Sequence, residues 1–193
     1  MHWEGEKRRK LEELERAIER GEVDETAIPV LETINSFKEY CTTSSCSGRV
    51  VVLHEPEVGD KIGSEFVAKW HEPPEPEEVR EAVLKAPEEG ITWVKAQPPL
   101  FHVMCRDLEA AVRLRNIASE AGFKASSIRS VKSSKVIVEI LGGERMDVPV
   151  KVNGELTLRE EAWDSVVALC TDILRSGHER LSRLVEALKG LSR

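Results

Sequence analysis

The 193-residue sequence contains more predicted short β-strands than helices between them. This excess of strands restricts the possible fold class more than any other feature. The last two strand segments flank Asn153-Gly154, a strong signal for a type I′ hairpin turn. Hairpins join antiparallel strands, whereas parallel strands need a long crossover. We therefore predict an α+β fold with an antiparallel or mixed β-sheet and flanking helices, and not a Rossmann-type fold. Strands are expected at about 50–53, 62–71, 91–97, 100–105, 125–131, 135–141, 146–152 and 155–158.

Apolar residues at helical spacing mark both ends of the chain and two segments between them. Gly21 is expected to end the first helix, Asp24 to cap the second and Asp107 to cap the fourth. The dipeptide Ser133-Ser134 is expected to form a turn between two strands. The helices are predicted at about 6–20, 24–40, 76–86, 107–121, 159–175 and 177–191.

The chain is predicted to form a single domain, residues 1–193. Two segments with strand–strand–helix order, 50–86 and 91–121, suggest an internal duplication. No apolar run approaches the roughly 18 residues that a membrane span needs, and the first residues lack an apolar secretory signal. We therefore expect a cytoplasmic protein that has no membrane partner.

Basic residues are concentrated in one part of an acidic chain, whose formal net charge is −7. A basic stripe on an acidic body can bind one RNA in one orientation and repel bulk polyanions, although an ordinary charged surface can show the same clustering. We expect three or four of these side chains to converge beside Ser44 to Arg49. The stripe consists of Arg113, Arg115, Lys124, Arg129, Lys132 and Lys135.

The most unusual stretch is TTSSCSGR at 42–49, which has too few apolar residues for an element of the core. Clustered hydroxyl groups, backbone N–H groups around a glycine and an adjacent arginine form a favourable site for an anion. A plain polar turn before a strand would have the same composition. The predicted anion site, for a phosphate or a carboxylate, consists of Ser44, Ser45, Cys46, Ser47, Gly48 and Arg49.

His71 and His102 lie within or at the end of predicted strands that lead into loops, so each is either a structural residue or a general base. A zinc site would have to combine Cys41, Cys46, Cys105 and His102. His102 and Cys105 are three residues apart in a predicted strand and therefore face opposite sides. We expect no metal, and we expect the cysteines to be reduced thiols.

A glycine-rich nucleotide-binding loop is missing from the sequence. The segment Leu141-Gly142-Gly143 follows a predicted strand, but no helix is predicted after it. The residues alone therefore do not indicate which cofactor the protein binds.

Several spaced motifs, in order along residues 5–175, resemble those of the tRNA wybutosine-synthesising protein 3 family. TTSSCSGR at 42–49 resembles the family signature that opens the first strand, and His71 matches a histidine after the second. LFHVMCR at 100–106 resembles the family's L-H-V-x-C-R strand. Further matches are AGFK at 121–124, SSI at 126–128, DVPV at 147–150 and GEL at 154–156.

The resemblance implies a tRNA methyltransferase that uses S-adenosylmethionine as methyl donor. The acceptor it implies is a ring nitrogen, N4, of a demethylwyosine-type tricyclic guanine beside the anticodon, and the partner is the anticodon stem-loop of tRNA-Phe. On this reading His102 or His71 removes the acceptor proton, and residues 44–49 hold the carboxylate of the donor or a tRNA phosphate. The residues expected to contact tRNA are Arg113, Lys124, Ser126, Arg129, Lys132 and Lys135.

Two other functions remain open at this stage. A non-catalytic RNA-binding module that assists another modification enzyme would keep the basic stripe and would need no methyl donor. A cysteine-dependent enzyme would use Cys46 as its nucleophile. Binding of S-adenosylmethionine separates the first alternative from a methyltransferase, and a Cys46→Ser variant separates the second.

Overall fold

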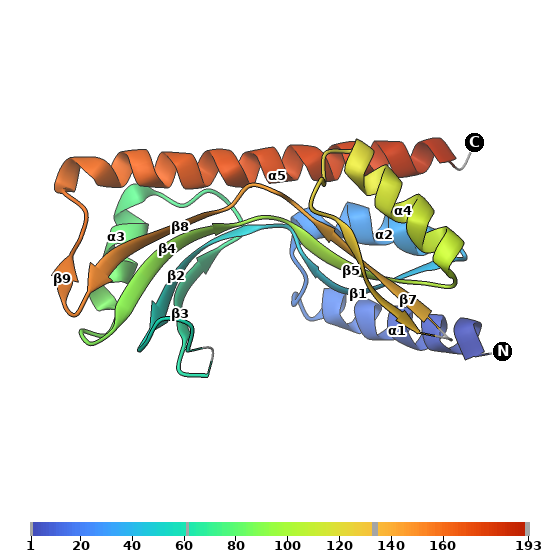
Figure 1. Ribbon diagram of the computed structural model, residues 1–193, viewed down its shortest axis with the longest axis horizontal. Coiled ribbons are helices and arrows are strands. Elements are labelled where there is room, and N and C mark those ends of the chain that lie inside the picture. Colours follow the sequence, from blue (N-terminus) through green and yellow to red (C-terminus); the bar gives the residue numbers. More distant parts are fainter. Residues whose placement is uncertain (1, 61, 133–134, 192–193) are drawn as a thin grey trace. The chain divides into compact units, whose positions relative to one another are not determined.

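The computed structural model describes residues 2–60, 62–132 and 135–191, which form two compact units (Figure 1). Unit 1 takes its residues from 1–47, 99–143 and 177–193, and unit 2 from 48–98 and 144–176. In chain order the helices (α), 3-10 helices (η) and strands (β) are α1 (His2–Glu19), η1 (Glu25–Ala27), α2 (Ile28–Ser36), β1 (Tyr40–Cys46), β2 (Arg49–Glu55), β3 (Glu65–Trp70), α3 (Pro76–Lys85), β4 (Ile91–Gln97), β5 (Leu100–Cys105), α4 (Leu108–Glu120), β6 (Ser127–Lys132), β7 (Lys135–Leu141), β8 (Met146–Val152), β9 (Glu155–Leu156), η2 (Glu160–Ala162) and α5 (Trp163–Leu191).

Unit 1 contains a four-stranded antiparallel sheet with the strand order β1-β5-β7-β6. Alternate residues of a strand face opposite sides, so Phe101 of β5 and Ile140 of β7 enter the core. Side chains of α2, α4 and the part of α5 after residue 176 complete this core. His102 and Glu139 are the neighbours of these apolar residues and therefore lie on the other face of the sheet.

Unit 2 contains a five-stranded antiparallel sheet with the strand order β3-β2-β4-β8-β9. Val50 and Val52 of β2 and Val94 of β4 point into its core. In Figure 1, α3 and the first part of α5 lie along this face of the sheet, and their side chains belong to the same core. Arg49 and Lys95 alternate with the core residues and face the other side.

The predicted α+β fold with antiparallel sheets is confirmed, and its strands follow the sequence pattern closely. The Asp107 carboxylate caps α4 as predicted, because it accepts a hydrogen bond from Ala110 N at 2.8 Å. Asn153 (φ 47°) and Gly154 (φ 84°) adopt the positive φ angles of the predicted hairpin turn. The predicted turn Ser133-Ser134 lies outside the described residues.

Residues 42–49 have too few apolar side chains for an element of the core, yet Tyr40–Cys46 forms strand β1. β1 is an edge strand of its sheet, so its polar side chains can face solvent or find partners on neighbouring elements. Thr42 is the buried example: its backbone N–H donates to Asn35 Oδ1 at 2.9 Å, and its hydroxyl accepts from Asn35 Nδ2 at 2.8 Å. Satisfied hydrogen bonds therefore take the place of apolar burial in this strand.

The prediction of a second helix from Asp24 to about Tyr40 is wrong at both ends. The Asp24 side chain makes no capping hydrogen bond to η1, and its carboxylate accepts from Ser47 instead. α2 ends at Ser36, and Tyr40 begins β1. Because Tyr40 is buried and its hydroxyl donates to Ala110 O at 3.2 Å, this ring belongs to the core and does not stack on a substrate.

The two predicted closing helices are one continuous helix, α5. Gly177, expected to begin the second of these helices, lies inside α5, because a single glycine costs a helix only about 1 kcal/mol relative to alanine. The missing side chain also makes room for a neighbour. A Cβ atom at position 177 would lie 2.8 Å from Cδ and 2.9 Å from Cγ of Pro99.

The strand pairing of the two units can be compared with the predicted single domain and internal duplication. β2 and β3 of the proposed repeat 50–86 pair with each other, whereas β4 and β5 of 91–121 belong to different sheets. The single domain and the internal duplication stay predictions. No helix of the described residues is both long enough and apolar enough to cross a membrane.

We predict that Gly177→Ala destabilises the protein, although alanine favours helix more than glycine does. The added methyl group would overlap the Pro99 ring, and overpacking of this kind costs typically about 1–3 kcal/mol, which outweighs a helical gain of about 1 kcal/mol. Thermal and urea unfolding measure the change. Gly190→Ala in the same helix is the control: no atom lies within 4 Å of its Cβ position, so its stability should stay equal or rise. A more stable Gly177→Ala variant would contradict the packing argument.

Candidate active site

Four side chains form a continuous polar array across the sheet of unit 1, with one residue on each strand. Ser44 of β1 is the register partner of His102 of β5, and His102 is the register partner of Glu139 of β7. Residues directly opposite each other on antiparallel strands have side chains on the same face and in contact. Arg129 of β6 completes the array at a point where the register of β6 and β7 shifts between Ile128 and Ser130.

Hydrogen bonds define how the His102 ring is protonated when it is neutral. Its Nε2 lies 3.0 Å from Glu139 Oε2, and its Nδ1 lies 2.7 Å from Ser44 Oγ. An ionised carboxylate only accepts hydrogen bonds, so Nε2 carries the proton. The lone pair of Nδ1 then accepts a hydrogen bond from the Ser44 hydroxyl. The array therefore joins a hydroxyl, a base and a carboxylate in the order that activates the hydroxyl.

The exposure of these groups follows the same order. The Ser44 residue is exposed, the His102 side chain is 32% exposed and the Glu139 side chain is 11% exposed. A carboxylate so deeply buried needs compensation. Glu139 obtains it from His102 at Oε2 and from Arg129, whose Nη1 lies 3.4 Å from Oε1.

Chemically, the array can take up a proton from a group bound next to Ser44. Ser44 would accept that proton and pass its own to His102 Nδ1, and Glu139 would stabilise the resulting imidazolium. The same geometry can also activate a serine as a nucleophile. The residues alone do not choose between these two reactions.

A half-open groove of about 210 Å³ borders the array, and Ser44 belongs to both. Lys10 and Glu13 of α1 form an ion pair at its wall, with Nζ and Oε2 2.7 Å apart and side chains 32% and 45% exposed. The hydrogen bond from Lys10 lowers the pKa of the Glu13 carboxyl, so both charges are present at neutral pH. The groove is lined by Lys10, Glu13, Leu14, Ala17, Leu31, Thr42, Thr43, Ser44 and Ser45.

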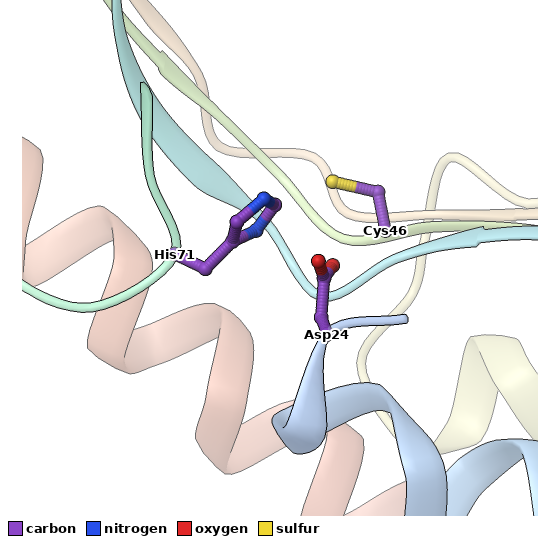
Figure 2. Close-up of side chains that lie close together, drawn as sticks. All are labelled: Asp24, Cys46 and His71. Carbon is purple, nitrogen blue, oxygen red and sulfur yellow. The ribbon is translucent and has the colours of Figure 1, made fainter. Parts of the chain in front are cut away.

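Within unit 1, Ser47 of the predicted anion site already binds a carboxylate of the protein. Ser47 donates from its backbone N at 2.9 Å and from its hydroxyl at 3.2 Å to Asp24 Oδ2. Figure 2 shows Asp24 together with Cys46, whose sulfur lies within 4.8 Å of a carboxylate oxygen of Asp24. Because Ser47 is buried and bound to a carboxylate, it does not offer its N–H group to an exogenous anion.

The remaining predicted residues of that stretch belong to unit 2. Gly48 has a φ of 99°, and its carbonyl oxygen lies 2.9 Å from Nδ1 of His71, which Figure 2 also labels. A carbonyl only accepts, so this nitrogen of His71 carries a proton. Arg49 Nε donates to Gln97 Oε1 at 2.6 Å, and its guanidinium carbon lies 4.8 Å from the centre of the Phe66 ring.

Part of the basic stripe lies on the face of the sheet that carries the array, and its convergence beside residues 44–49 stays a prediction. Arg129 joins the array, but Arg113 pairs with Glu109 and Glu39 beside α4, and Lys135 pairs with Glu6 of α1. Ser126 is buried, and its hydroxyl accepts from Leu141 N at 3.2 Å. Lys124 and Lys132 are exposed. Lys132 is the register partner of Lys135, which lies on the same face of β7 as Glu139.

The cysteines of unit 1 do not form the zinc cluster considered from the sequence. Cys105 is buried, and burial raises the pKa of its thiol to about 12. Burial also raises the pKa of Cys41. Neither thiol belongs to a cluster of metal-binding side chains among the described residues. The absence of a bound metal stays a prediction.

Sequence reasoning did not identify Glu139, Lys10 or Glu13. Glu139 is the only charged residue in the otherwise apolar segment Val136–Leu141, and a carboxylate in such a strand is a signal of function. Lys10 and Glu13 lie on an amphipathic helix rich in charges, where nothing in the sequence separates them from their neighbours.

The comparisons with known proteins identify the family. The profile described as Methyltransferase TYW3 matches residues 5–190. The chain is 42% identical over 192 residues to "tRNA(Phe) 7-((3-amino-3-carboxypropyl)-4-demethylwyosine(37)-N(4))-methyltransferase 1" of Pyrococcus horikoshii, covering 100% of this chain and 97% of the relative. It is 43% identical over 190 residues to the protein of the same name from Thermococcus kodakarensis, covering 98% and 96%.

Solved structures agree with the sequence relatives. A protein of Pyrococcus horikoshii superposes with a TM-score of 0.91 at 43% identity, covering 96% of this chain and 95% of that chain. A hypothetical protein of Aeropyrum pernix superposes with a TM-score of 0.75 at 27% identity, covering 87% and 98%. Since the family profile and these relatives each span nearly the whole chain, the protein belongs to the Methyltransferase TYW3 family.

Proposed function

We propose that this protein methylates N4 of 7-(3-amino-3-carboxypropyl)-4-demethylwyosine at position 37 of tRNA(Phe), in the cytoplasm, with S-adenosylmethionine as the methyl donor. The names of the full-length relatives support the substrate and the reaction. The observation that carries the chemistry is the hydrogen-bonded array Ser44–His102–Glu139. A module that only binds tRNA would need no such proton-transfer groups.

S-adenosylmethionine would supply a methyl group from its sulfonium centre: the acceptor nitrogen attacks the methyl carbon in line, the carbon–sulfur bond breaks, and S-adenosylhomocysteine leaves. The acceptor N4 gains this methyl group and must lose its proton. Ser44 takes that proton while its own moves to His102 Nδ1, and Glu139 stabilises the imidazolium. Arg129 holds the second oxygen of Glu139, so the carboxylate keeps its orientation toward Nε2. We propose His102, rather than His71, as the base because its lone pair meets an exposed hydroxyl.

The groove beside Ser44 fits the donor by the chemistry of its lining. The methionine part of S-adenosylmethionine carries one carboxylate and one ammonium group, which Lys10 and Glu13 would hold. Leu14, Ala17 and Leu31 would provide apolar contacts for the adenosine. The groove lies on a strand and a helix and needs no glycine-rich loop. Of the predicted anion site, Ser44 and Ser45 line it.

For tRNA we propose that Lys124, Arg129 and Lys132 remain contacts of unit 1, because all three are exposed and Arg129 lies beside the array. The anticodon stem-loop is the part of tRNA that carries position 37. Arg113, Lys135 and Ser126 are weaker choices, since the side chains of Arg113 and Lys135 are less exposed than that of Arg129 and Ser126 is buried.

The reaction itself has a direct test. We expect the purified protein, given S-adenosylmethionine, to add one methyl group to tRNA(Phe) from a strain that accumulates the demethylated nucleoside. Mass spectrometry of the digested nucleosides measures the gain, and the same tRNA from a strain with complete modification is the control. No mass gain with a folded protein that binds the tRNA would refute the proposed activity.

Replacing His102 by alanine should lower kcat by about 10²–10⁴, the usual contribution of a general base. Ser44→Ala should have a similar effect because it interrupts the path to Nδ1, and Glu139→Gln should lower kcat by a smaller factor. Steady-state methylation assays give kcat, and calorimetry tests whether the affinity for S-adenosylmethionine is retained. Ser130→Ala, on the same sheet but outside the array, is the control. Normal kcat in both His102→Ala and Ser44→Ala would remove the array from the mechanism.

Lys10→Ala and Glu13→Gln should each raise the Kd for S-adenosylmethionine roughly tenfold, because a hydrogen bond to a charged group is worth about 1.5–3 kcal/mol. The value of kcat at saturating donor should change little, since neither residue belongs to the array. Calorimetric titration measures Kd. Arg8→Ala is a matched control, because Arg8 also pairs with a glutamate of α1, Glu12 at 4.0 Å, and does not line the groove. Unchanged Kd values would place the donor elsewhere.

A further inference from the structure

On one face of the unit 2 sheet, the described residues of that unit place no helix, and this face carries an exposed aromatic ring. α3 and α5 pack on the face that carries Val50 and Val52. Phe66 and Lys69 of β3 are the register partners of Leu53 and Val51 of β2, and therefore lie on the opposite face. Phe66, the second residue of β3, is 42% exposed, which is a large exposure for an aromatic side chain.

Two cations contact this ring. The guanidinium carbon of Arg49 lies 4.8 Å from the ring centre of Phe66, and Nζ of Lys69 lies 4.6 Å from it. A ring attracts a cation at this distance, but two like charges on one ring also repel each other. We call Arg49, Phe66 and Lys69 the Phe66 cluster.

The charges of the Phe66 cluster are not balanced by carboxylates, in contrast to another cation–ring pair on the same face. Lys95 lies 4.8 Å from the ring centre of Trp93, and it also has Glu55 at 3.7 Å and Asp147 at 3.9 Å. Over the described ranges, neither Arg49 nor Lys69 forms an ion pair. In a chain with a net charge of −7, two adjacent unpaired cations form a specific place for an anion.

Hydrogen bonding also prepares Arg49 for such a partner. Its Nε donates to Gln97 Oε1 at 2.6 Å, and Gln97 is its register partner on β4. This bond fixes one edge of the guanidinium and leaves the terminal nitrogens for a second acceptor. A fixed guanidinium with two terminal N–H groups matches the oxygens of a phosphate.

We propose that the Phe66 cluster binds an unpaired stretch of the tRNA substrate, with Arg49 and Lys69 on consecutive phosphates and Phe66 against a base or ribose. Aromatic and cationic side chains together on an open sheet face are the usual means of holding single-stranded RNA, because stacking and phosphate contacts act on the same nucleotides. An acidic peptide would use the cations but would not need the ring. This inference rests on the proposed function only in taking tRNA as the ligand.

The test uses the double variant Arg49→Gln/Lys69→Gln of the full chain. The probe is an RNA hairpin with the sequence of the tRNA(Phe) anticodon arm, titrated at several salt concentrations. Each phosphate contact on single-stranded RNA contributes about 0.7 to the slope of log K against log salt. The variant should therefore lose about 1.4 of slope and bind about 25-fold more weakly at 0.1 M salt. Phe66→Leu should weaken binding with the slope unchanged.

Arg145→Gln is the matched control, because Arg145 is also an exposed cation of unit 2 but pairs with Asp147 at 2.5 Å. It removes one positive charge, where the double variant removes two, and it should leave affinity and slope unchanged. Circular dichroism and S-adenosylmethionine binding verify that every variant is folded. The double variant should also raise KM for tRNA and keep kcat at saturating tRNA.

Unchanged RNA affinity and slope in a folded double variant would overturn the proposal. Loss of binding to polyglutamate without loss of RNA binding would overturn it in favour of an acidic protein partner. Because RNA binding is measured without turnover, a protein that lacks methyl transfer but shows the expected loss of slope would refute the proposed function and leave the RNA surface standing.

Discussion

The register of three antiparallel strands determines the chemistry of unit 1. Ser44, His102 and Glu139 meet only because β1, β5 and β7 pair with these residues directly opposite one another. A shift of one residue in either pairing would turn a side chain of the array to the other face. The apolar neighbours prevent such a shift, since Phe101 and Ile140 must stay in the core. The core thus holds the polar array in place without contacting its substrate side.

How much of this was visible in the sequence differs from element to element. The alternation of apolar residues gave the correct bounds of β4, β5, β7 and β8, because each has one buried face. β1 was not predicted as a strand, since its polar residues form hydrogen bonds with residues elsewhere in the chain, Asn35 and His102. The two closing helices were predicted separately, and the local pattern around Gly177 does not reveal that α5 continues through it with Pro99 packed against the glycine.

The candidate site was visible in part for a similar reason. Ser44 and His102 stood out by composition and by resemblance, but their pairing depends on strand order, which local patterns do not determine. Glu139 was missed because its partners come from other strands. Arg49 was singled out as an anion-binding residue, yet nothing in the sequence indicated that Phe66 and Lys69 would be its neighbours.

Two buried lysines of the protein show how an ammonium group is satisfied inside the fold. Lys151 is 4% exposed and donates to Ala86 O at 3.0 Å and to Glu88 at 2.8 Å. Lys7 is 8% exposed and donates to the carbonyl oxygens of Asn35 and Phe37, and burial lowers its pKa. Each of these ammonium groups has acceptors from the protein itself. In the Phe66 cluster, by contrast, Lys69 is exposed and Arg49 donates only its Nε to a protein acceptor, Gln97, so the terminal nitrogens of Arg49 are available to a ligand.

The discontinuity of unit 1 has a consequence for the synthesis of the protein. Its core combines Leu31 and Ile34 of α2 with Leu181, Leu184 and Leu188 near the end of α5. During synthesis, α2 therefore cannot complete this core until the end of α5 has left the ribosome. Closing so long a loop is costly in entropy and slows folding. A ribosome that stops early, before α5 is complete, therefore releases a chain whose first core cannot close, and such chains are natural targets for proteolysis.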